Sequence, residues 1–377
     1  MLERATTTEI KKVNRKNIFD LIYKEKKISK QDIALKLQLS LPTVAQNLKE
    51  LESLNLIKKD GSFESTGGRK ANAIVLISDA KIAIGLEIAK KRFQILALDL
   101  YGTIVKSIQY ETPFENSEKY FETVGDYTNQ FIKNLRISSK RILGVGIALQ
   151  GLISSDGKTV TYGKILGCDC LKVTSFSKFI PFPCTMIHDA EAAASAELWH
   201  CSSISDAIYF HMGNNLGGAV IIDGELHKGR ELKSGVIEHM VIIPDGKPCY
   251  CGKKGCLEVY CSIESLLDPQ EGLPVFFDKL HHNDVSALAR WDNYLGHLAL
   301  AIDNLHMVID CDTILGGELV SYLSPEDILK LKNLVSSETA FPFENNFIKV
   351  SSCNTMPIAS GAALVFIKAF LNSVTDI

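Results

Sequence analysis

The stretch from His239 to Glu258 constrains this chain more than any other, because it brings one histidine and three cysteines into a short segment. The cysteines, Cys249, Cys251 and Cys256, follow the spacing C-x-C-x4-C, and two glycines stand between the second and the third. Three thiolates and one imidazole form a ligand set that a closed, tetrahedral structural zinc ion prefers. We therefore predict that these four side chains bind one Zn²⁺. The alternative is a loop with incidental cysteines, in a chain that has ten of them.

Length and composition indicate a globular chain with more than one domain. The chain has 377 residues, 46% of them apolar, which is enough for two or three domains with a substantial core. The first residues are polar and lead directly into a charged helical segment, unlike a secretory signal. No apolar run approaches the roughly 18 residues that a membrane helix needs. We expect a cytoplasmic protein with reduced thiols and no membrane partner.

The charge is distributed unevenly along the chain. Residues 1–78 hold 15 Lys and Arg against 9 Asp and Glu, whereas the remainder holds 26 against 35. A basic N-terminal part on an acidic body predicts that this end of the chain binds a polyanion.

A helix-turn-helix pattern occupies the first half of the basic part. Apolar residues at helical spacing predict a helix over residues 8–26, a short helix that begins near Ser29, and a third helix from Ser40 to about Leu54. In this motif the N-terminal part of the last helix enters the major groove of double-stranded DNA. The residues expected to face DNA there are Pro42, Thr43, Gln46, Asn47 and Lys49. A small helical bundle without a DNA role is the alternative.

Two β-like runs follow, over residues 56–59 and 73–77, and they predict the hairpin of a winged helix. The connection contains Gly67, Gly68, Arg69 and Lys70. The glycines allow the backbone to approach a surface, and the two basic residues could contact phosphates or a minor groove. We expect Arg69 and Lys70 to bind DNA, with a solvated hairpin as the alternative.

The pattern C-x-C-G-x-x-G-C-x-E from Cys249 to Glu258, preceded by His239, resembles the signature of the ROK family of sugar kinases and sugar-responsive repressors. The Gly-Gly-Arg run of the hairpin resembles the wing of the repressor members. The resemblance implies an α/β chain: an N-terminal winged helix-turn-helix followed by a two-lobed, actin-like (ribonuclease H-like) ROK kinase fold. Residues 1–78 would form the DNA-binding domain, 79–200 the first lobe with a closing helix 361–377, and 201–360 the second lobe with the zinc site.

One departure from the family's kinases concerns the phosphate-binding turn. The kinases place a glycine-rich run there, but this chain has Glu87-Ile-Ala-Lys-Lys-Arg92. Without glycines, Cβ atoms crowd the backbone N–H groups that would hold a phosphate. We therefore predict that the chain is not an enzyme and has no catalytic residue.

The resemblance also implies a sugar site between the lobes. Its expected residues are Gly151, His188, Asp189, Glu238, His239 and Glu258. Asp189 matches the kinases' general base, whereas His188 stands where they have asparagine and Glu238 where they have glycine. Asp189 could instead act only as a helix cap, and Glu258 could be structural.

Together these features predict a sugar-responsive DNA-binding regulator, most consistent with a repressor. A sugar or sugar derivative bound between the lobes would change the separation of two DNA-reading helices in a homodimer or a dimer of dimers, and so release a double-stranded operator. Two alternatives stay open: an active ATP-dependent sugar kinase of the same family, and a constitutive repressor that has lost its effector.

Overall fold

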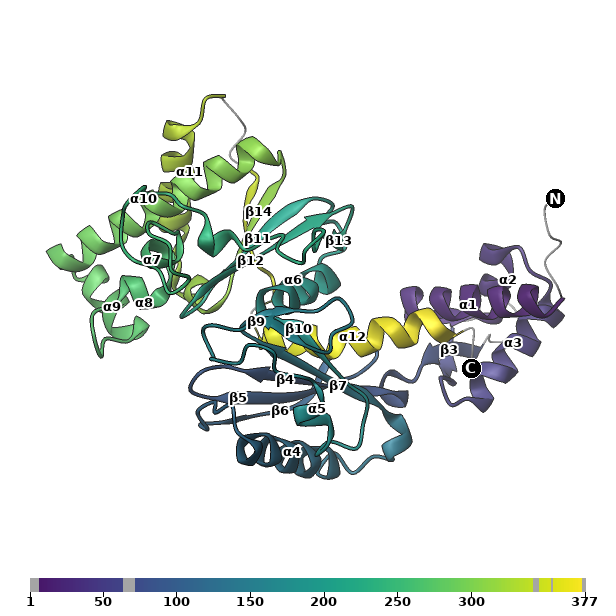
Figure 1. Cartoon of the computed structure of the whole chain (residues 1–377). Coiled ribbons are helices and arrows are strands. Elements are labelled where there is room, and N and C mark those ends of the chain that lie inside the picture. The colour runs from purple at the N-terminus through teal and green to yellow at the C-terminus, as the bar shows by residue number, and fades with distance from the viewer. Residues whose placement is uncertain (1–6, 64–71, 342–345, 354, 375–377) are drawn as a thin grey trace.

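The computed structural model describes residues 7–63, 72–341, 346–353 and 355–374. Along the chain there is a small N-terminal module, then two lobes that each contain a five-stranded sheet (Figure 1). The last helix, α12 (Pro357–Ser373), extends from the lobes to the N-terminal module and lies beside it.

The N-terminal module consists of three helices and a three-stranded antiparallel sheet in the order β1-β3-β2. Its elements are α1 (Thr7–Glu25), β1 (Ile28–Ser29), α2 (Lys30–Leu37), α3 (Leu41–Ser53), β2 (Ile57–Ser62) and β3 (Asn72–Leu76). Ser29 and Ser40 cap α2 and α3, since their hydroxyls accept hydrogen bonds from the N–H groups of Asp32 and Thr43. The predicted order of helices and strands is confirmed.

The first lobe is a mixed sheet in the order β10-β7-β4-β5-β6, with α4 on one face (Figure 1). The strands β4, β5 and β6 are antiparallel neighbours, and β4, β7 and β10 are parallel. The elements of this lobe are β4 (Ile82–Ile88), β5 (Phe93–Leu98), β6 (Ile104–Tyr110), α4 (Glu118–Lys133), β7 (Ile142–Leu149), β8 (Leu152–Ile153), β9 (Val160–Tyr162), α5 (Thr174–Ser177), β10 (Cys184–His188) and α6 (Asp189–His200). The buried strands β4, β5 and β7 read as nearly continuous apolar runs because both faces of the sheet are covered.

The second lobe has a sheet in the order β13-β12-β11-β14-β15 and a group of helices on one side. Its elements are β11 (Ala207–Met212), β12 (Leu216–Ile222), β13 (Glu225–Leu226), α7 (Glu258–Cys261), α8 (Ile263–Leu266), α9 (Leu273–His281), α10 (Val285–Val308), β14 (Asp312–Gly316), α11 (Pro325–Glu338) and β15 (Ile348–Val350). A short 3-10 turn, Ile237–His239, connects this sheet to the cysteine-rich segment.

Small residues allow α12 to pack very closely on the first lobe and on α6. A Cβ atom at Gly146 in β7 would lie 1.9 Å from the carbonyl oxygen of Ala362. A Cβ atom at Gly361 would lie 1.7 Å from the carbonyl oxygen of Ala192 in α6. Since neither backbone can move away without disturbing a buried strand or helix, these glycines fix α12 and α6 against each other.

The N-terminal module shares a hydrophobic core with the first lobe. One apolar cluster contains Ile18 and Phe19 of α1, Leu98 of β5, and Ile367 and Phe370 of α12. The module is therefore packed on the body rather than connected to it only by a linker, and a movement of the body can reach α1 and the helices packed against it. None of the helices in the described part of the chain is both long enough and apolar enough to cross a membrane.

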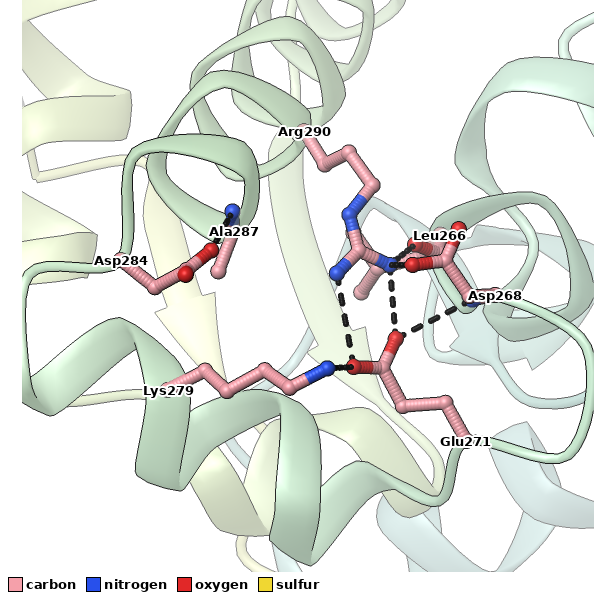
Figure 2. Close-up of polar contacts among 7 residues, drawn as sticks. All are labelled: Leu266, Asp268, Glu271, Lys279, Asp284, Ala287 and Arg290. Carbon is pink, nitrogen blue, oxygen red and sulfur yellow. Dashed lines mark hydrogen bonds and ion pairs between the residues drawn. The ribbon is translucent and has the colours of Figure 1, made fainter.

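An ion-pair cluster joins the helices of the second lobe around the buried carboxylate of Glu271 (Figure 2). Arg290 of α10 donates to it at 2.7 and 3.4 Å, Lys279 of α9 at 2.7 Å, and the N–H of Asp268 at 3.1 Å. The Arg290 hydrogen bonds, followed by that of Lys279, lower the pKa of Glu271 to about 2. The ionised carboxylate is therefore stabilised in the folded state.

We expect Glu271→Gln to lower the free energy of unfolding by about 2 kcal/mol at pH 7, because a charged partner is lost while the shape is kept. The folded pKa lies below the ordinary value of about 4.3, so this stabilisation is present above that value and disappears as pH falls toward 2. Urea unfolding at several pH values measures it. Glu118→Gln, which affects an exposed ion pair with Lys178, is the control and should change nothing measurable. An equal loss of unfolding free energy in both variants would contradict the stabilising role assigned to the ion pairs of Glu271.

Candidate functional site: a metal centre beside an interlobe cavity

The four predicted zinc ligands lie together. One ligand atom from each of His239, Cys249, Cys251 and Cys256 lies within 4.8 Å of all the others. The Cys249 Sγ is 3.7 Å from His239 Nδ1, and the Sγ atoms of Cys251 and Cys256 are also 3.7 Å apart. Around a tetrahedral zinc with Zn–S bonds near 2.3 Å, two sulfurs would be about 3.8 Å apart. The donor set and its spacing fit a closed zinc site.

Backbone turns at two glycines direct the thiols toward one point. Gly252 and Gly255 have φ angles of +92° and +75°, a region that other residues rarely adopt. A Cβ atom at Gly255 would lie 1.7 Å from the carbonyl oxygen of Ile243. The turn is closed by hydrogen bonds from Cys249 N to Lys253 O and from Gly252 N to Cys249 O, at 2.8 and 2.9 Å. Burial raises the pKa of Cys249 to about 12, so a cation is needed to keep this thiol deprotonated.

A cavity of about 820 Å³ lies between the lobes, next to this cluster. Five of the six residues predicted to contact a sugar line it: Gly151, His188, Asp189, Glu238 and His239. Gly151 follows β7 in the first lobe, and His188 and Asp189 stand where β10 passes into α6. Glu238 and His239 come from the second lobe. The cavity therefore has contributions from both lobes, as a ligand that controls their closure requires.

Asp189 begins α6 and is held in place by its neighbours. Its Oδ1 accepts a hydrogen bond from the N–H of Ala190 at 2.8 Å and lies 3.2 Å from the Nε2 of His188. Asp189 also lines the cavity, and a carboxylate accepts hydrogen bonds from hydroxyl groups particularly well. Asp189 is thus the first residue of α6, after the N-cap position of His188, and a polar group on the wall of the cavity.

Glu238 is a buried carboxylate with an unpartnered oxygen. The residue is 7% exposed, and its Oε2 has no hydrogen-bond partner among the described residues. Burial, followed by the negative charges of Glu258 and Asp189, raises the pKa of Glu238 to about 8. A buried acceptor without a partner is costly, and a ligand hydroxyl in the cavity would satisfy it.

Glu258 has a different position from the other predicted sugar residues and is not among those that line the cavity. Its Oε1 accepts from the side-chain amide of Asn215 and its Oε2 from the N–H of Leu216, both at 2.8 Å. The carboxylate is therefore occupied by the protein itself, and it supports Asn215, which does line the cavity. In this structure Glu258 thus has a supporting position, and its direct contact with a ligand stays a prediction.

The lining residues that were not identified from the sequence include Gln150, Asn215 and Tyr250. Gln150 of the first lobe donates to the Oδ1 of Asn215 in the second lobe at 3.3 Å, so this pair bridges the cleft. Tyr250 packs edge-on against His239, with ring centroids 5.1 Å apart. Two features of the sequence could have indicated these residues. Gln150 directly precedes Gly151, and Tyr250 stands between the predicted zinc ligands Cys249 and Cys251.

The turn between β4 and β5 is closed by protein groups. Ala89 N donates to Arg92 O at 3.0 Å, and an Arg92 nitrogen lies 3.8 Å from Glu87 Oε1. Glu87 is buried, and burial raises its pKa to about 7 despite the nearby Arg92 charge. The arginine thus pairs with a carboxylate of its own chain at this turn.

The exposed face of α3 carries part of the predicted DNA-binding set. Pro42, Gln46 and Lys49 are exposed and Thr43 is half-buried. Asn47 is only 4% exposed, and its amide donates to the carbonyl oxygen of Thr43 at 2.9 Å. Its side chain belongs to the interior of the module in this structure, and a contact of Asn47 with DNA stays a prediction. Arg69 and Lys70 lie outside the described residues.

Comparison with known proteins agrees with both parts of the chain. The profile of the ROK family matches residues 83–368, and that of a winged helix-turn-helix DNA-binding domain matches residues 13–58. The xylose repressors of Bacillus spizizenii and Bacillus subtilis are each 25% identical over 99% of this chain and 100% of their own length. The Escherichia coli DNA-binding transcriptional dual regulator NagC is 26% identical over 66% of this chain and 62% of its own length.

Solved structures show the same fold. The crystal structure of a ROK family transcriptional regulator, described as a homolog of the E. coli MLC protein, has a TM-score of 0.76 at 18% identity and covers 97% of this chain and 99% of its own. A ROK hexokinase from Thermus thermophilus has a TM-score of 0.63 at 18% identity, covering 75% of this chain and 97% of its own. The predicted winged helix on a two-lobed, kinase-like body is confirmed.

Proposed function

This chain belongs to the ROK family, and from that we propose that it is a sugar-responsive transcriptional repressor. The observation that carries the proposal is a winged helix whose core is continuous with a two-lobed body containing an interlobe cavity. Relatives that align with nearly the whole chain are named xylose repressors, which supports the same function. We propose a double-stranded operator as the macromolecular partner and the cytoplasm as the place of action.

We propose that the effector is a sugar or sugar derivative held by Asp189, Glu238 and His239. Asp189 offers a carboxylate oxygen, and Glu238 a buried oxygen without a partner, to ligand hydroxyls. Apolar lining residues such as Val236 and Leu232 suit the C–H face of a ring. Gln150 and Asn215 add two amides from opposite lobes.

We propose that Zn²⁺ is held by His239 and the three cysteines as a structural ion. When bound, the ion would supply a fixed tetrahedral link between the 3-10 turn and the cysteine segment. The Nδ1 of His239 faces Cys249, which leaves Nε2 for the cavity. The histidine would thereby orient the effector site from the metal side.

The coupling to DNA follows from packing. A sugar can shift the repressor only through different affinities for the DNA-competent and the incompetent arrangement. Lobe closure around the ligand would move α6 and α12, which are locked together at Gly361, and α12 shares its core with α1. In a homodimer this would change the distance between two α3 helices, which must match the spacing of operator half-sites.

An active kinase is the second candidate, because Asp189 stands where the family's kinases have their general base. Against it, Arg92 is paired with Glu87 at the turn where a phosphate would lie. A coupled ATP assay with hexoses, pentoses and N-acetylhexosamines distinguishes the two functions. Turnover that is lost in Asp189→Asn would replace the repressor-only proposal.

The DNA contacts are tested at Gln46 and Lys49, with an operator selected from random DNA. Gln46→Ala should weaken operator binding by about 1–3 kcal/mol and random DNA much less, because an amide that reads base edges contributes only at the right sequence. Lys49→Ala should weaken both, as expected for a phosphate contact. Fluorescence anisotropy measures the two affinities.

Gln130→Ala, an exposed glutamine on α4 of the body, is the matched control and should leave both affinities unchanged. Equal losses on operator and random DNA for Gln46→Ala would show that α3 does not read the operator in this orientation.

A further inference from the structure

A second cavity, of about 1000 Å³, lies where the N-terminal module meets both lobes. We call it the junction cavity. Its walls are the end of α1, the turn between β5 and β6, the end of α6, the turn between β12 and β13, the segment after β15, and α12. It is therefore separate from the cavity between the lobes. Its lining comes from the N-terminal module and from both lobes, which are the parts that lobe closure would move.

The polar lining of the junction cavity is predominantly cationic. Lys24, Lys26 and Lys368 line it, against the single carboxylate of Glu225. Within the described residues, none of these three lysines has a carboxylate within 4.0 Å. Lys368 is half-buried on α12, and burial lowers its pKa although Glu225 acts in the opposite direction. A partly buried ammonium without an ion pair is costly, and a bound anion would compensate it.

One wall of the junction cavity is aromatic and firmly held. Tyr23 of α1 packs against Tyr101 with ring centroids 4.9 Å apart, and its hydroxyl donates to Leu100 O at 3.1 Å. The Trp199 indole at the end of α6 donates to Tyr101 O at 2.9 Å. A Cβ atom at Gly102 would lie 2.4 Å from that indole nitrogen, so the turn fits closely around it. This wall offers flat, apolar surface to a ring.

Lysines beside an aromatic wall suit a molecule with a phosphate group on a small ring, and the Nζ of Lys26 lies 5.9 Å from the ring centroid of Tyr101. Phosphate monoesters are dianionic near neutral pH and accept several charge-assisted hydrogen bonds from lysine. Hydroxyl groups of Thr103, Thr355 and Ser360 also line the junction cavity and could donate to the same anion. We propose that the junction cavity is a binding site for a small phosphate-bearing metabolite, distinct from the sugar site.

A ligand in the junction cavity would be positioned to influence both sugar binding and DNA binding. This consequence rests on the proposed repressor function. Helix α6 carries Asp189 of the sugar cavity at its first residue and Trp199 of the junction cavity near its last. Tyr23, which belongs to the same aromatic wall, lies on α1, the helix that also carries the core residue Ile18 of the N-terminal module. One rigid helix thus connects the two cavities.

The test is calorimetric titration of the full, zinc-loaded chain with inorganic phosphate and with phenyl phosphate, against chloride at equal ionic strength. We expect saturable binding of both anions, tighter for phenyl phosphate because its ring can contact Trp199, with a matching change in tryptophan fluorescence. Lys368→Gln and Lys24→Gln should each weaken binding by about tenfold, while Lys368→Arg should retain it. Lys133→Gln, an exposed lysine at the end of α4, is the matched control and should bind like the unaltered chain.

No saturable binding of either anion, or equal affinities in the unaltered chain and both Lys→Gln variants, would overturn the proposal. Lys24 is exposed at the end of α1, so its variant keeps the test valid even if Lys368→Gln fails to fold. The titration contains neither DNA nor sugar, so its failure would leave the repressor function standing. Conversely, if the chain failed to bind an operator or to respond to sugar, the anion affinities measured by this titration would still stand.

Discussion

Replacing Cys251 by serine is expected to reduce bound zinc from about one ion per chain to a small fraction, and to lower the free energy of unfolding by at least about 3 kcal/mol. The physical reason is that a serine hydroxyl is a poor zinc ligand at neutral pH, whereas the thiolate forms one of four bonds in a closed site. Structural zinc binds folded zinc-finger peptides with about 10–16 kcal/mol, and that free energy contributes directly to folding. Elemental analysis of the purified protein measures the zinc, and urea unfolding measures the stability.

Cys170→Ser is the matched control, because Cys170 is an exposed free thiol outside the ligand group. It should keep the zinc content and stability of the unaltered chain. A chelator should lower the stability of the unaltered chain and of Cys170→Ser, but change Cys251→Ser little, since that variant has little metal to lose. A folded, metal-free protein that a chelator does not affect would refute the zinc assignment.

The clustering of His239 with the three cysteines was predictable because all four residues lie within one short segment. The spacing of the cysteines and the glycines at 252 and 255 already determine a tight turn, and the structure brings the four donors within 4.8 Å of one another. The helix caps at Ser29 and Ser40 were predictable for the same reason, since a cap involves residues only three apart.

Features that depend on distant residues were not predictable in the same way. The carboxylate of Glu258 is taken by Asn215 and Leu216, more than forty residues earlier, and no local pattern indicates that pairing. Asn47 illustrates a different effect, because the helical period places it with the buried residues Val44 and Leu51. Its polar character suggested a DNA contact, but a hydrogen bond to Thr43 O allows the amide to be buried.

The packing of the N-terminal module on the body was also not evident from the sequence. A boundary near residue 78 suggests two independent units, yet Ile18 and Phe19 share a cluster with Ile367 and Phe370 of the last helix. The apolar residues of α12 could be recognised, but not which surface they cover. This shared core explains how a ligand between the lobes can influence a helix in the N-terminal module, because close-packed interiors transmit displacement.

Replacing Asp189 by asparagine is expected to abolish release of the operator by the effector while leaving operator affinity without effector nearly unchanged. Asparagine keeps the size of the side chain but removes the charge that strengthens hydrogen bonds from ligand hydroxyls. Two such hydrogen bonds, each contributing about 1.5–3 kcal/mol, correspond to a loss of sugar affinity of a hundredfold or more. Thermal shift with a panel of sugars identifies the effector, and anisotropy with the selected operator measures the release.

Glu191→Gln is the matched control for this prediction. Glu191 lies in the first turn of the same helix but pairs with Lys228 at 2.9 Å and is not among the residues that line the sugar cavity. It should bind sugar and release the operator like the unaltered chain. If Asp189→Asn responded to the same sugar concentrations, the cavity would not be the effector site. If no sugar stabilised or released even the unaltered chain, a constitutive repressor would replace the sugar-responsive one, because a ligand that binds neither arrangement cannot shift the balance between them.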